Sequence, residues 1–225
     1  MQPRIFIVIP AFNEARRLGT VLDSLAPCGH RIVVVDDGSA DRTADVARRH
    51  GCYVLRHTSN RGQGAALQTG ITFALREGAD VVVTFDADGQ HHPSDLPALL
   101  APILSRRADV TLGNRFLSTQ SNVPPLRRVV LQVARWFTRA ASGVRVGDCH
   151  NGYRAFSRRA AETVALKQDR MAHASELYDQ IRAARLTFEE VPVTIRYTAD
   201  TLAKGQKLSN SFSVLFQYLY GKIAQ

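Results

Sequence analysis

The sequence predicts an α/β fold, built on a mainly parallel sheet with helices on both of its faces. Two observations predict it. Short apolar runs rich in Val and Ile, each bounded by polar or Gly-containing turns, indicate buried strands. Segments of helical periodicity alternate with these runs through the first half of the chain. The strands are expected at residues 4–9, 31–35, 53–56, 80–85 and 109–112, and the helices at residues 14–25, 41–50, 64–76 and 94–106.

In the second half of the chain, strands and helices no longer alternate regularly. A polar loop containing two prolines precedes a basic amphipathic helix, expected over residues 126–141. No internal repeat, low-complexity tract or shift in composition marks a domain boundary, so one domain over residues 1–225 is expected. The remaining elements are expected as a strand over residues 152–156, a helix over 173–184, a strand over 187–197 and an aromatic-rich final helix.

The formal net charge of +9 at pH 7 indicates an anionic partner. Three kinds are compatible with it, namely nucleic acid, an anionic membrane surface and phosphorylated small molecules. The sequence contains no helix-turn-helix, zinc-finger or RNA-binding aromatic motif, so no nucleic-acid partner is expected. Most basic residues form scattered pairs, which are typical of solvated helix faces.

The cysteines and the N-terminal segment indicate the cellular compartment in which the protein is expected. Cys28, Cys52 and Cys149 have neither the even number of a disulfide framework nor the spacing of zinc ligands. The apolar run after Met1 is too short for a signal peptide, and no segment reaches the roughly 20 apolar residues of a membrane span. We therefore expect reduced thiols in a cytoplasmic protein that is not integral to a membrane.

A polar motif follows the fourth expected strand. Asp86 and Asp88 lie one residue apart on a tight turn, and Gln90 follows two residues later. Carboxylate and amide oxygens are the hard ligands that Mg²⁺ and Mn²⁺ require, and this set leaves positions open for phosphates and water. Two aspartates in such a spacing are also common in polar turns that use Asp for capping. The motif alone leaves both interpretations open.

Two further motifs follow the second and third strands. Asp36 and Asp37 end a wholly apolar strand, where a carboxylate could accept hydrogen bonds from a nucleobase or ribose. The alternative for them is an Asx-turn and helix capping. Residues 60–66 form a Gly-rich turn that opens a helix, and the free backbone N–H groups of such a turn bind anions.

Four motifs together resemble family 2 glycosyltransferases in their order and spacing. They are Ile-Pro-Ala-Phe-Asn-Glu at 9–14, Val-Asp-Asp-Gly-Ser at 35–39, Asn-Arg-Gly-Gln-Gly-Ala at 60–65 and Asp-Ala-Asp-Gly-Gln-His-His-Pro at 86–93. The chain is similar in particular to the polyprenyl-phosphate branch, which includes dolichol-phosphate mannose synthases. The likeness continues through residues 113–116 and 148–156 and covers nearly the whole chain.

The resemblance implies a GT-A fold, with a mainly parallel, Rossmann-like central sheet. It implies an inverting, metal-dependent transfer of a hexose from a UDP- or GDP-sugar to a polyprenyl phosphate. The alternative within the family is transfer to a sugar hydroxyl or other soluble glycan acceptor in polysaccharide or glycolipid synthesis.

The resemblance also implies roles for residues on the donor side. Mg²⁺ or Mn²⁺ would be held by Asp86, Asp88 and Gln90. One departure is Gln63, where many relatives carry a lysine near the phosphates. The nucleotide-sugar site would be formed by Pro10, Ala11, Asn13, Glu14, Asp37, Gly62, Gln63, Asp86, Ala87 and Asp88.

On the acceptor side, the chemistry depends on the attacking group. A hydroxyl acceptor needs a carboxylate base to take its proton, whereas a phosphate is already an anion and needs none. Asp148 and Glu176 are the candidate bases, and Arg115 would meet the donor phosphate or the acceptor. The expected catalytic residues are Asp88, Arg115, Asp148 and Glu176, and the residues expected to bind an acceptor phosphate are Arg154, Lys204 and Lys207.

We expect three parts within the domain. Residues 1–115 form the nucleotide-sugar half, residues 116–208 the acceptor-side half, and residues 209–225 an amphipathic C-terminal helix with apolar side chains at helical spacing. Such a stripe is usual in a core or a homodimer contact. The alternative is an interfacial helix that, with the basic surface, holds the enzyme against the anionic face of the cytoplasmic membrane.

Two other interpretations of the chain, a dinucleotide-dependent enzyme and a transferase without activity, are weaker. Gly62 and Gly64 resemble part of a dinucleotide-binding motif, but they follow the third strand rather than the first, and Leu67 replaces the third glycine. That interpretation also leaves Asp86 and Asp88 without a role. A degenerate transferase that only binds nucleotide would not be expected to retain both aspartates.

Overall fold

The structure is a computed structural model that describes residues 2–119, 121, 123, 132, 144, 146–149, 151–166 and 173–197. Within these residues, the strands of one sheet are β1 (Ile5–Ala11), β2 (Arg31–Asp36), β3 (Tyr53–Arg56), β4 (Val81–Thr84), β5 (Val110–Asn114), β6 (Arg154–Ser157) and β7 (Phe188–Pro192). The helices are α1 (Ala15–Leu25), α2 (Thr43–Arg49), α3 (Gln63–Arg76), α4 (Leu96–Leu104), α6 (Arg158–Thr163) and α7 (His173–Ala183), with short 3-10 turns at Ala26–Cys28 and Pro93–Asp95.

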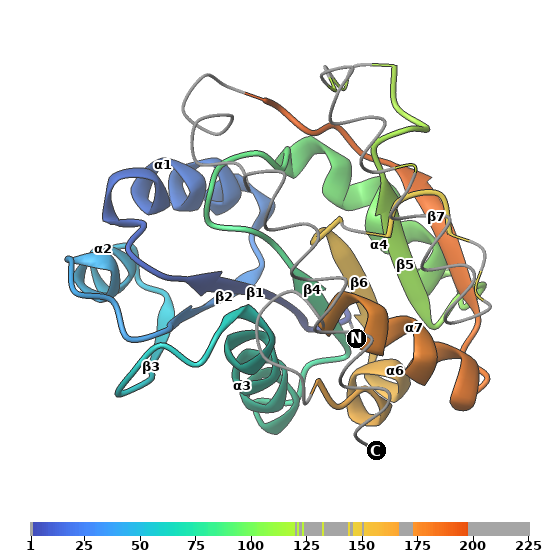
Figure 1. The fold of residues 1–225 in the computed structure, drawn as a ribbon, viewed down its shortest axis with the longest axis horizontal. Coiled ribbons are helices and arrows are strands. Elements are labelled where there is room, and N and C mark those ends of the chain that lie inside the picture. The colour runs from blue at the N-terminus through green and yellow to red at the C-terminus, as the bar shows by residue number, and fades with distance from the viewer. Residues whose placement is uncertain are drawn as a thin grey trace.

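The strands pair in the order β3-β2-β1-β4-β6-β5-β7 (Figure 1). β1 runs parallel to β2 and β4, β2 runs parallel to β3, and β5 runs parallel to β7. β6 is antiparallel to both β4 and β5, between which it lies. The prediction of a mainly parallel sheet is confirmed, and β6 is the strand that reverses direction.

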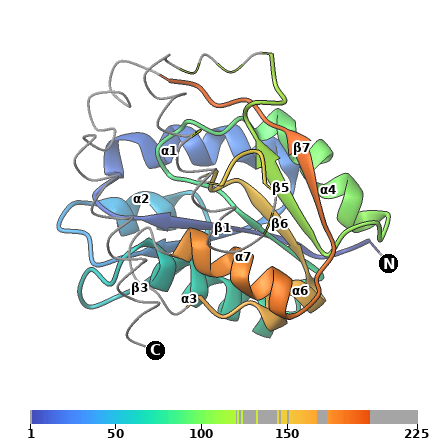
Figure 2. The ribbon, with the colours of Figure 1, turned by 45° about the vertical axis from the view of Figure 1, so that its right-hand side comes forward.

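Helices cover both faces of this sheet (Figures 1 and 2). α1, α2 and α4 pack on one face, and α3, α6 and α7 pack on the other. The side chains of β1 divide accordingly, with Ile7 and Ile9 facing the first layer and Phe6 and Val8 facing the second. All four are 0% exposed. Burying each such side chain contributes about 1.5–3 kcal/mol to folding stability. The packing of β1 therefore fixes the position at which the following loop begins.

Two stretches differ from the sequence-based expectation. The strand expected over residues 187–197 ends at Pro192 as β7, and Ile195 beyond it pairs with His91 in an isolated bridge. Proline has no N–H to donate to a neighbouring strand, which favours the end of β7 there. Helix α6 was not expected. It begins where the Ser157 hydroxyl accepts a hydrogen bond from the Ala160 N–H (3.2 Å), a capping contact.

No helix in the described part of the chain combines the length and the apolar character that crossing a bilayer requires. The helix expected over residues 126–141 falls almost entirely outside the described residues, and the helix expected over 209–225 falls entirely outside them.

Candidate active site

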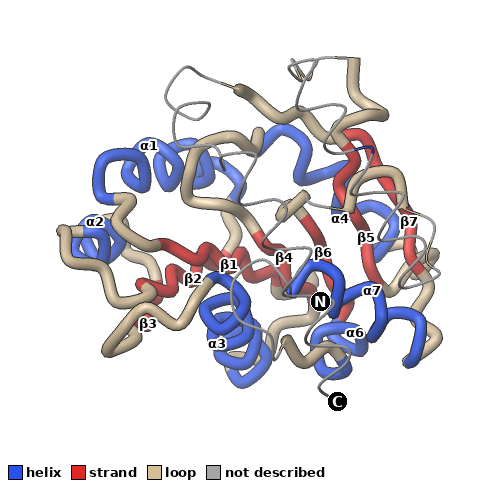
Figure 3. The backbone as a smooth tube through the Cα atoms, viewed as in Figure 1, coloured by secondary structure: helices blue, strands red, loops and turns tan. Residues whose placement is uncertain are grey.

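The motifs predicted from the sequence meet at one edge of the sheet. β1, β2 and β4 run in the same direction, so the loops that follow them leave from the same edge (Figure 3). Pro10 and Ala11 are the last residues of β1, and the Ala11 carbonyl accepts a hydrogen bond from the N–H of Asp37 (2.9 Å). The N–H of Phe85 donates likewise to the Val8 carbonyl (3.0 Å). Ligands of open α/β sheets bind at this edge, so the fold places the candidate site here.

The Asp86 carboxylate is held from three sides. Its Oδ1 accepts a hydrogen bond from Nε2 of Gln63 (3.0 Å), the first residue of α3. Its Oδ2 lies 3.4 Å from Nε2 of His91. The backbone of Gly152 closes the third side, since a Cβ at that position would come within 2.6 Å of Oδ2. A side chain at residue 152 would therefore displace this carboxylate.

Asp88 follows on the same turn, and its Oδ1 accepts a hydrogen bond from the N–H of Gln90 (2.9 Å). Burial raises the pKa of Asp86, an effect that the positive charges of Arg154 and Arg115 oppose. Burial also raises the pKa of Asp88, and repulsion from Asp86 raises it further. Two partly buried carboxylates that repel each other favour a bound cation, because the cation removes the repulsion.

The donor atoms fit Mg²⁺ or Mn²⁺. The carboxylates of Asp86 and Asp88 and the side-chain amide of Gln90 offer hard oxygen ligands on one turn. Across the described residues, no group of three or more His, Cys, Asp and Glu side chains is arranged to hold a metal ion. A cation at this turn would therefore have few protein ligands and keep positions for water and ligand phosphates, as Mg²⁺ commonly does.

Asp37 organises the loop that precedes α3. Its Oδ1 accepts a hydrogen bond from the N–H of Arg61 (2.9 Å), and its Oδ2 accepts one from the N–H of Gly62 (2.7 Å). Nδ1 of His57 donates to Oδ1 as well (2.7 Å), while Nε2 of His57 lies 3.0 Å from the Thr69 hydroxyl. The sequence predicted a nucleotide contact for Asp37. In the structure its carboxylate binds the loop, and through the loop it shapes the start of α3.

The loop after β1 is bound to the loop after β2. The N–H of Asn13 donates to the Ser39 hydroxyl (2.9 Å), and Oδ1 of Asn13 accepts a hydrogen bond from the N–H of Ala40 (2.9 Å). The N–H of Glu14 donates to the Thr43 hydroxyl (2.9 Å). Asn13 has a left-handed φ of 54°, which Asn adopts more readily than most residues. These contacts fix the backbone of two predicted nucleotide-site residues.

Arg115 and Asp148 form a buried ion pair. Nε of Arg115 donates to Oδ2 of Asp148 (2.6 Å), and so does its backbone N–H (3.1 Å). Nη1 of Arg115 donates to the Tyr197 hydroxyl (2.6 Å). Burial disfavours the guanidinium charge, but Asp148 and Tyr197 together raise the pKa of Arg115 above its ordinary value. Two predicted catalytic residues are thus brought together as partners of each other.

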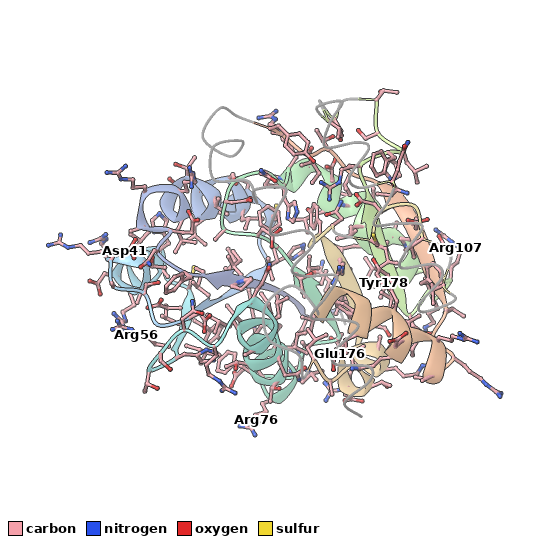
Figure 4. The ribbon with its side chains drawn as sticks, viewed as in Figure 1. Asp41, Arg56, Arg76, Arg107, Glu176 and Tyr178 are labelled. Carbon is pink, nitrogen blue, oxygen red and sulfur yellow. The ribbon has the colours of Figure 1, made fainter. Side chains whose placement is uncertain are left out.

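Arg154, at the start of β6, is 4% exposed. Its guanidinium carbon lies 6.0 Å from the ring centroid of Tyr178, and its Nε has no hydrogen-bond partner within the described residues. Glu176 and Tyr178 both belong to α7 (Figure 4), which packs on the same face of the sheet as α3. Lys204 and Lys207, predicted to act with Arg154, lie outside the described residues.

Three side chains at the site were not assigned a role from the sequence. His57 holds Asp37, and His91 contacts Asp86. Tyr153 stacks on His91, with ring centroids 4.7 Å apart. His91 lies within the fourth motif, and that position was the available signal. Tyr153 likewise lies within residues 148–156, over which the resemblance continues, whereas the contacts of His57 depend on the fold and have no such signal.

Comparisons with known proteins agree with this architecture. A family model described as Glycosyl transferase family 2 matches residues 6–165. The polyprenol monophosphomannose synthase of Mycolicibacterium smegmatis is 34% identical over 223 residues, which cover 92% of this chain and 82% of that protein. The UDP-N-acetylglucosamine–dolichyl-phosphate N-acetylglucosaminyltransferase of Methanococcus voltae is 29% identical over 243 residues, covering 98% and 97%.

One similar solved structure is glucosyl-3-phosphoglycerate synthase from Mycobacterium tuberculosis, in complex with Mn²⁺, UDP and phosphoglyceric acid. It has a TM-score of 0.76 and 21% sequence identity, and the likeness covers 96% of this chain and 76% of that one. At this identity the likeness bears on the fold alone. It confirms the GT-A fold that the resemblance implied.

Proposed function

The chain belongs to glycosyl transferase family 2, and we propose that it moves a hexose from a UDP- or GDP-sugar to a polyprenyl phosphate, with inversion at the anomeric carbon. Membership of this family makes it a glycosyltransferase. One relative is named a polyprenol monophosphomannose synthase and another a transferase to dolichyl phosphate, and both names support a lipid phosphate as acceptor. The observation that carries the proposal is the partly buried Asp86 and Asp88 pair at the carboxyl end of β4.

On the donor side, Asp86, Asp88 and Gln90 would hold Mg²⁺ or Mn²⁺. Bound there, the cation would neutralise the negative charge that grows on the departing nucleoside diphosphate. The hard oxygen ligands and the raised pKa of both carboxyls support this assignment. Ala87, between the two aspartates, is 5% exposed and anchors the turn in the core.

The nucleotide would bind along the loops after β1 and β2 and before α3. Gly62 is the N-cap of α3 and makes no side-chain cap, so it leaves the first-turn N–H groups for another acceptor. Such N–H groups favour phosphate oxygens. Asp37 would act by fixing the loop that carries Gly62. The proposed nucleotide-site residues are Pro10, Ala11, Asn13, Glu14, Asp37, Gly62, Gln63, Asp86, Ala87 and Asp88.

The acceptor side supports an anionic acceptor. A phosphate oxygen is already charged, so its attack on the anomeric carbon needs no base. Asp148, a candidate base, is bonded to Arg115, which favours a role in holding that arginine. The positive charges of Arg115 and Arg154 would attract the donor diphosphate and the acceptor phosphate. Glu176 stays the predicted base for a hydroxyl acceptor, and Lys204 and Lys207 stay predicted ligands of the acceptor phosphate.

A polyprenyl chain lies in a membrane, so the proposal includes contact with an anionic membrane face on the cytoplasmic side. The net charge of +9 supports such contact. The predicted helix over residues 209–225 would provide it, or would form a homodimer contact instead. Liposome co-sedimentation of the full chain, with and without these residues, separates the two.

The test of the function is a panel of nucleotide-sugars (UDP-glucose, UDP-GlcNAc, UDP-galactose and GDP-mannose), assayed with Mg²⁺ or Mn²⁺ and a short polyprenyl phosphate. Release of nucleoside diphosphate is measured with and without the lipid. Release that requires both metal and lipid is the expected result, and it names the donor. Metal-dependent donor binding without lipid-stimulated release would overturn the lipid acceptor and favour a hydroxyl or other soluble acceptor.

Replacing Asp88 tests the metal site within this assay. We expect Asp88→Ala to lower turnover by more than about 100-fold, since charge on the leaving group is then not neutralised. Asp45→Ala is the matched control, because Asp45 pairs with Arg48 on the surface of α2 and is 57% exposed. Circular dichroism should show both variants folded. Turnover of Asp88→Ala at the control's rate would remove the metal-site assignment.

A further inference from the structure

His91 contacts Asp86 through both of its ring nitrogens. Its Nδ1 accepts a hydrogen bond from the backbone N–H of Asp86 (3.2 Å). Nδ1 therefore carries no proton, and the neutral ring carries its proton on Nε2. That Nε2 lies 3.4 Å from Oδ2 of Asp86. One side chain thus constrains both the backbone and the carboxylate of the same aspartate.

The ring of His91 is itself held in place. It stacks on Tyr153 with ring centroids 4.7 Å apart and an interplanar angle of 13°, and it forms a T-shaped pair with Phe85 at a centroid distance of 5.2 Å. The residue is 7% exposed, and it pairs with Ile195 in a β-bridge. Aromatic pairs in these geometries contribute about 0.5–1.5 kcal/mol beyond burial. The ring cannot turn away from Asp86 without losing these contacts.

Gln63 holds the other carboxylate oxygen. Its Nε2 donates to Oδ1 of Asp86 (3.0 Å). The position of Gln63 is set by the preceding residues Arg61 and Gly62, whose N–H groups are bound to Asp37. An amide is uncharged, so it orients the carboxylate and leaves its negative charge available to a cation.

Asp88 lacks this kind of support in the contacts that the structure describes. Its Oδ1 is bonded to the N–H of Gln90, two residues away on the same turn. Asp86 is instead fixed by side chains from α3 and from the loop that follows the turn. We propose that His91 and Gln63 are positioning residues that fix the Asp86 carboxylate as a metal ligand. The inference rests on the metal site of the proposed function and is independent of the acceptor.

The test is Mn²⁺ binding to the full chain at neutral pH, followed by loss of the electron paramagnetic resonance signal of free Mn²⁺, with and without UDP. His91→Phe keeps an aromatic ring against Tyr153 and removes both nitrogens. Loss of an outer partner of a metal ligand typically costs 10–100-fold in affinity, so we expect the Kd for Mn²⁺ to rise by about that factor. In the turnover assay, the apparent KM for Mn²⁺ should rise while kcat at saturating Mn²⁺ recovers.

Two further variants sharpen the test. His91→Gln restores a nitrogen donor and should recover part of the affinity. His92→Gln is the matched control, because His92 is the next residue and bonds instead to the Ser94 hydroxyl (2.6 Å). It should bind Mn²⁺ as the wild type does.

A folded His91→Phe variant with the wild-type Kd for Mn²⁺ would overturn the role of His91. Gln63→Ala provides a second test away from the core, and we expect its Kd to rise as well. An unchanged Kd in Gln63→Ala would overturn the role of Gln63. A wild-type chain that takes up no Mn²⁺ would contradict the metal site and this inference together. A wild-type chain that binds Mn²⁺ but transfers nothing to lipid would contradict the acceptor alone, and the Kd comparison would still decide the roles of His91 and Gln63.

Discussion

Two regions of the site hold their key carboxylates in different ways. On the proposed nucleotide side, Asp37 accepts hydrogen bonds from the backbone N–H groups of Arg61 and Gly62 and from the imidazole of His57. On the proposed acceptor side, Asp148 is paired with the guanidinium of Arg115, with the two side chains 1% and 6% exposed. The first carboxylate orders a loop. The second belongs to a charge pair that has been removed from water.

The two regions also differ in how far apart their partners lie in the chain. Asp37 and Gly62 are 25 residues apart, within one strand–helix–strand unit. Arg115 is 33 residues from Asp148 and 82 residues from Tyr197. The Arg115–Asp148 pair therefore forms only when segments that are distant in the sequence pack beside the end of β5. Because a broken buried ion pair leaves an unpaired charge, this side should be the more sensitive to single substitutions.

The largest effect is expected from Asp148→Ala. It leaves the Arg115 guanidinium buried without its carboxylate, which costs about 3–5 kcal/mol of unfolding free energy. Urea denaturation followed by circular dichroism measures it. The double variant with Arg115→Met removes the stranded charge and should recover most of the loss. If Asp148→Ala destabilises the protein by less than Asp37→Asn does, the contrast between the two regions is wrong.

A smaller effect is expected from Asp37→Asn. One side-chain oxygen remains, but the amide NH₂ would face an N–H donor of Arg61 or Gly62. An unsatisfied buried donor costs about 1–3 kcal/mol, and the cost should be local to this loop. Hydrogen exchange should therefore accelerate at residues 61 and 62 and stay unchanged in β7. Equal acceleration in both places would show that Asp37 supports the whole fold rather than one loop.

The difference between the regions also explains what could be predicted from the sequence. The first five strands and the helices between them were predicted within two or three residues of the observed bounds, because each strand–helix unit carries its own apolar pattern and turn signals. The placement of Asp37 and Asp86 at the ends of β2 and β4 followed from the same patterns, since a polar residue directly after a buried strand must lie at the edge of the sheet.

The hydrogen-bond and ion-pair partners of the site residues could not be predicted in the same way. Asp37 was recognisable as a functional position, but its partners include two backbone N–H groups, and any residue type supplies those. Arg115 and Asp148 were both selected as catalytic candidates, yet no pattern indicates that they pair. The antiparallel direction of β6 sets Gly152 beside Asp86, and in the sequence β6 is separated from β5 by residues 115–153.

The smallest loss of stability is expected from a substitution at Glu190. This residue provides a stricter test of the comparison between the two regions. This carboxylate is on the proposed acceptor side but resembles Asp37, because it accepts hydrogen bonds from the Gly147 N–H (2.8 Å) and from the Asn114 amide (3.1 Å). It is only partly buried, so water can satisfy what a substitution leaves unpaired. We expect Glu190→Gln to cost about 0.5–1 kcal/mol in urea denaturation. A loss as large as that of Asp148→Ala would mean that the acceptor side is fragile throughout, rather than at its buried ion pair.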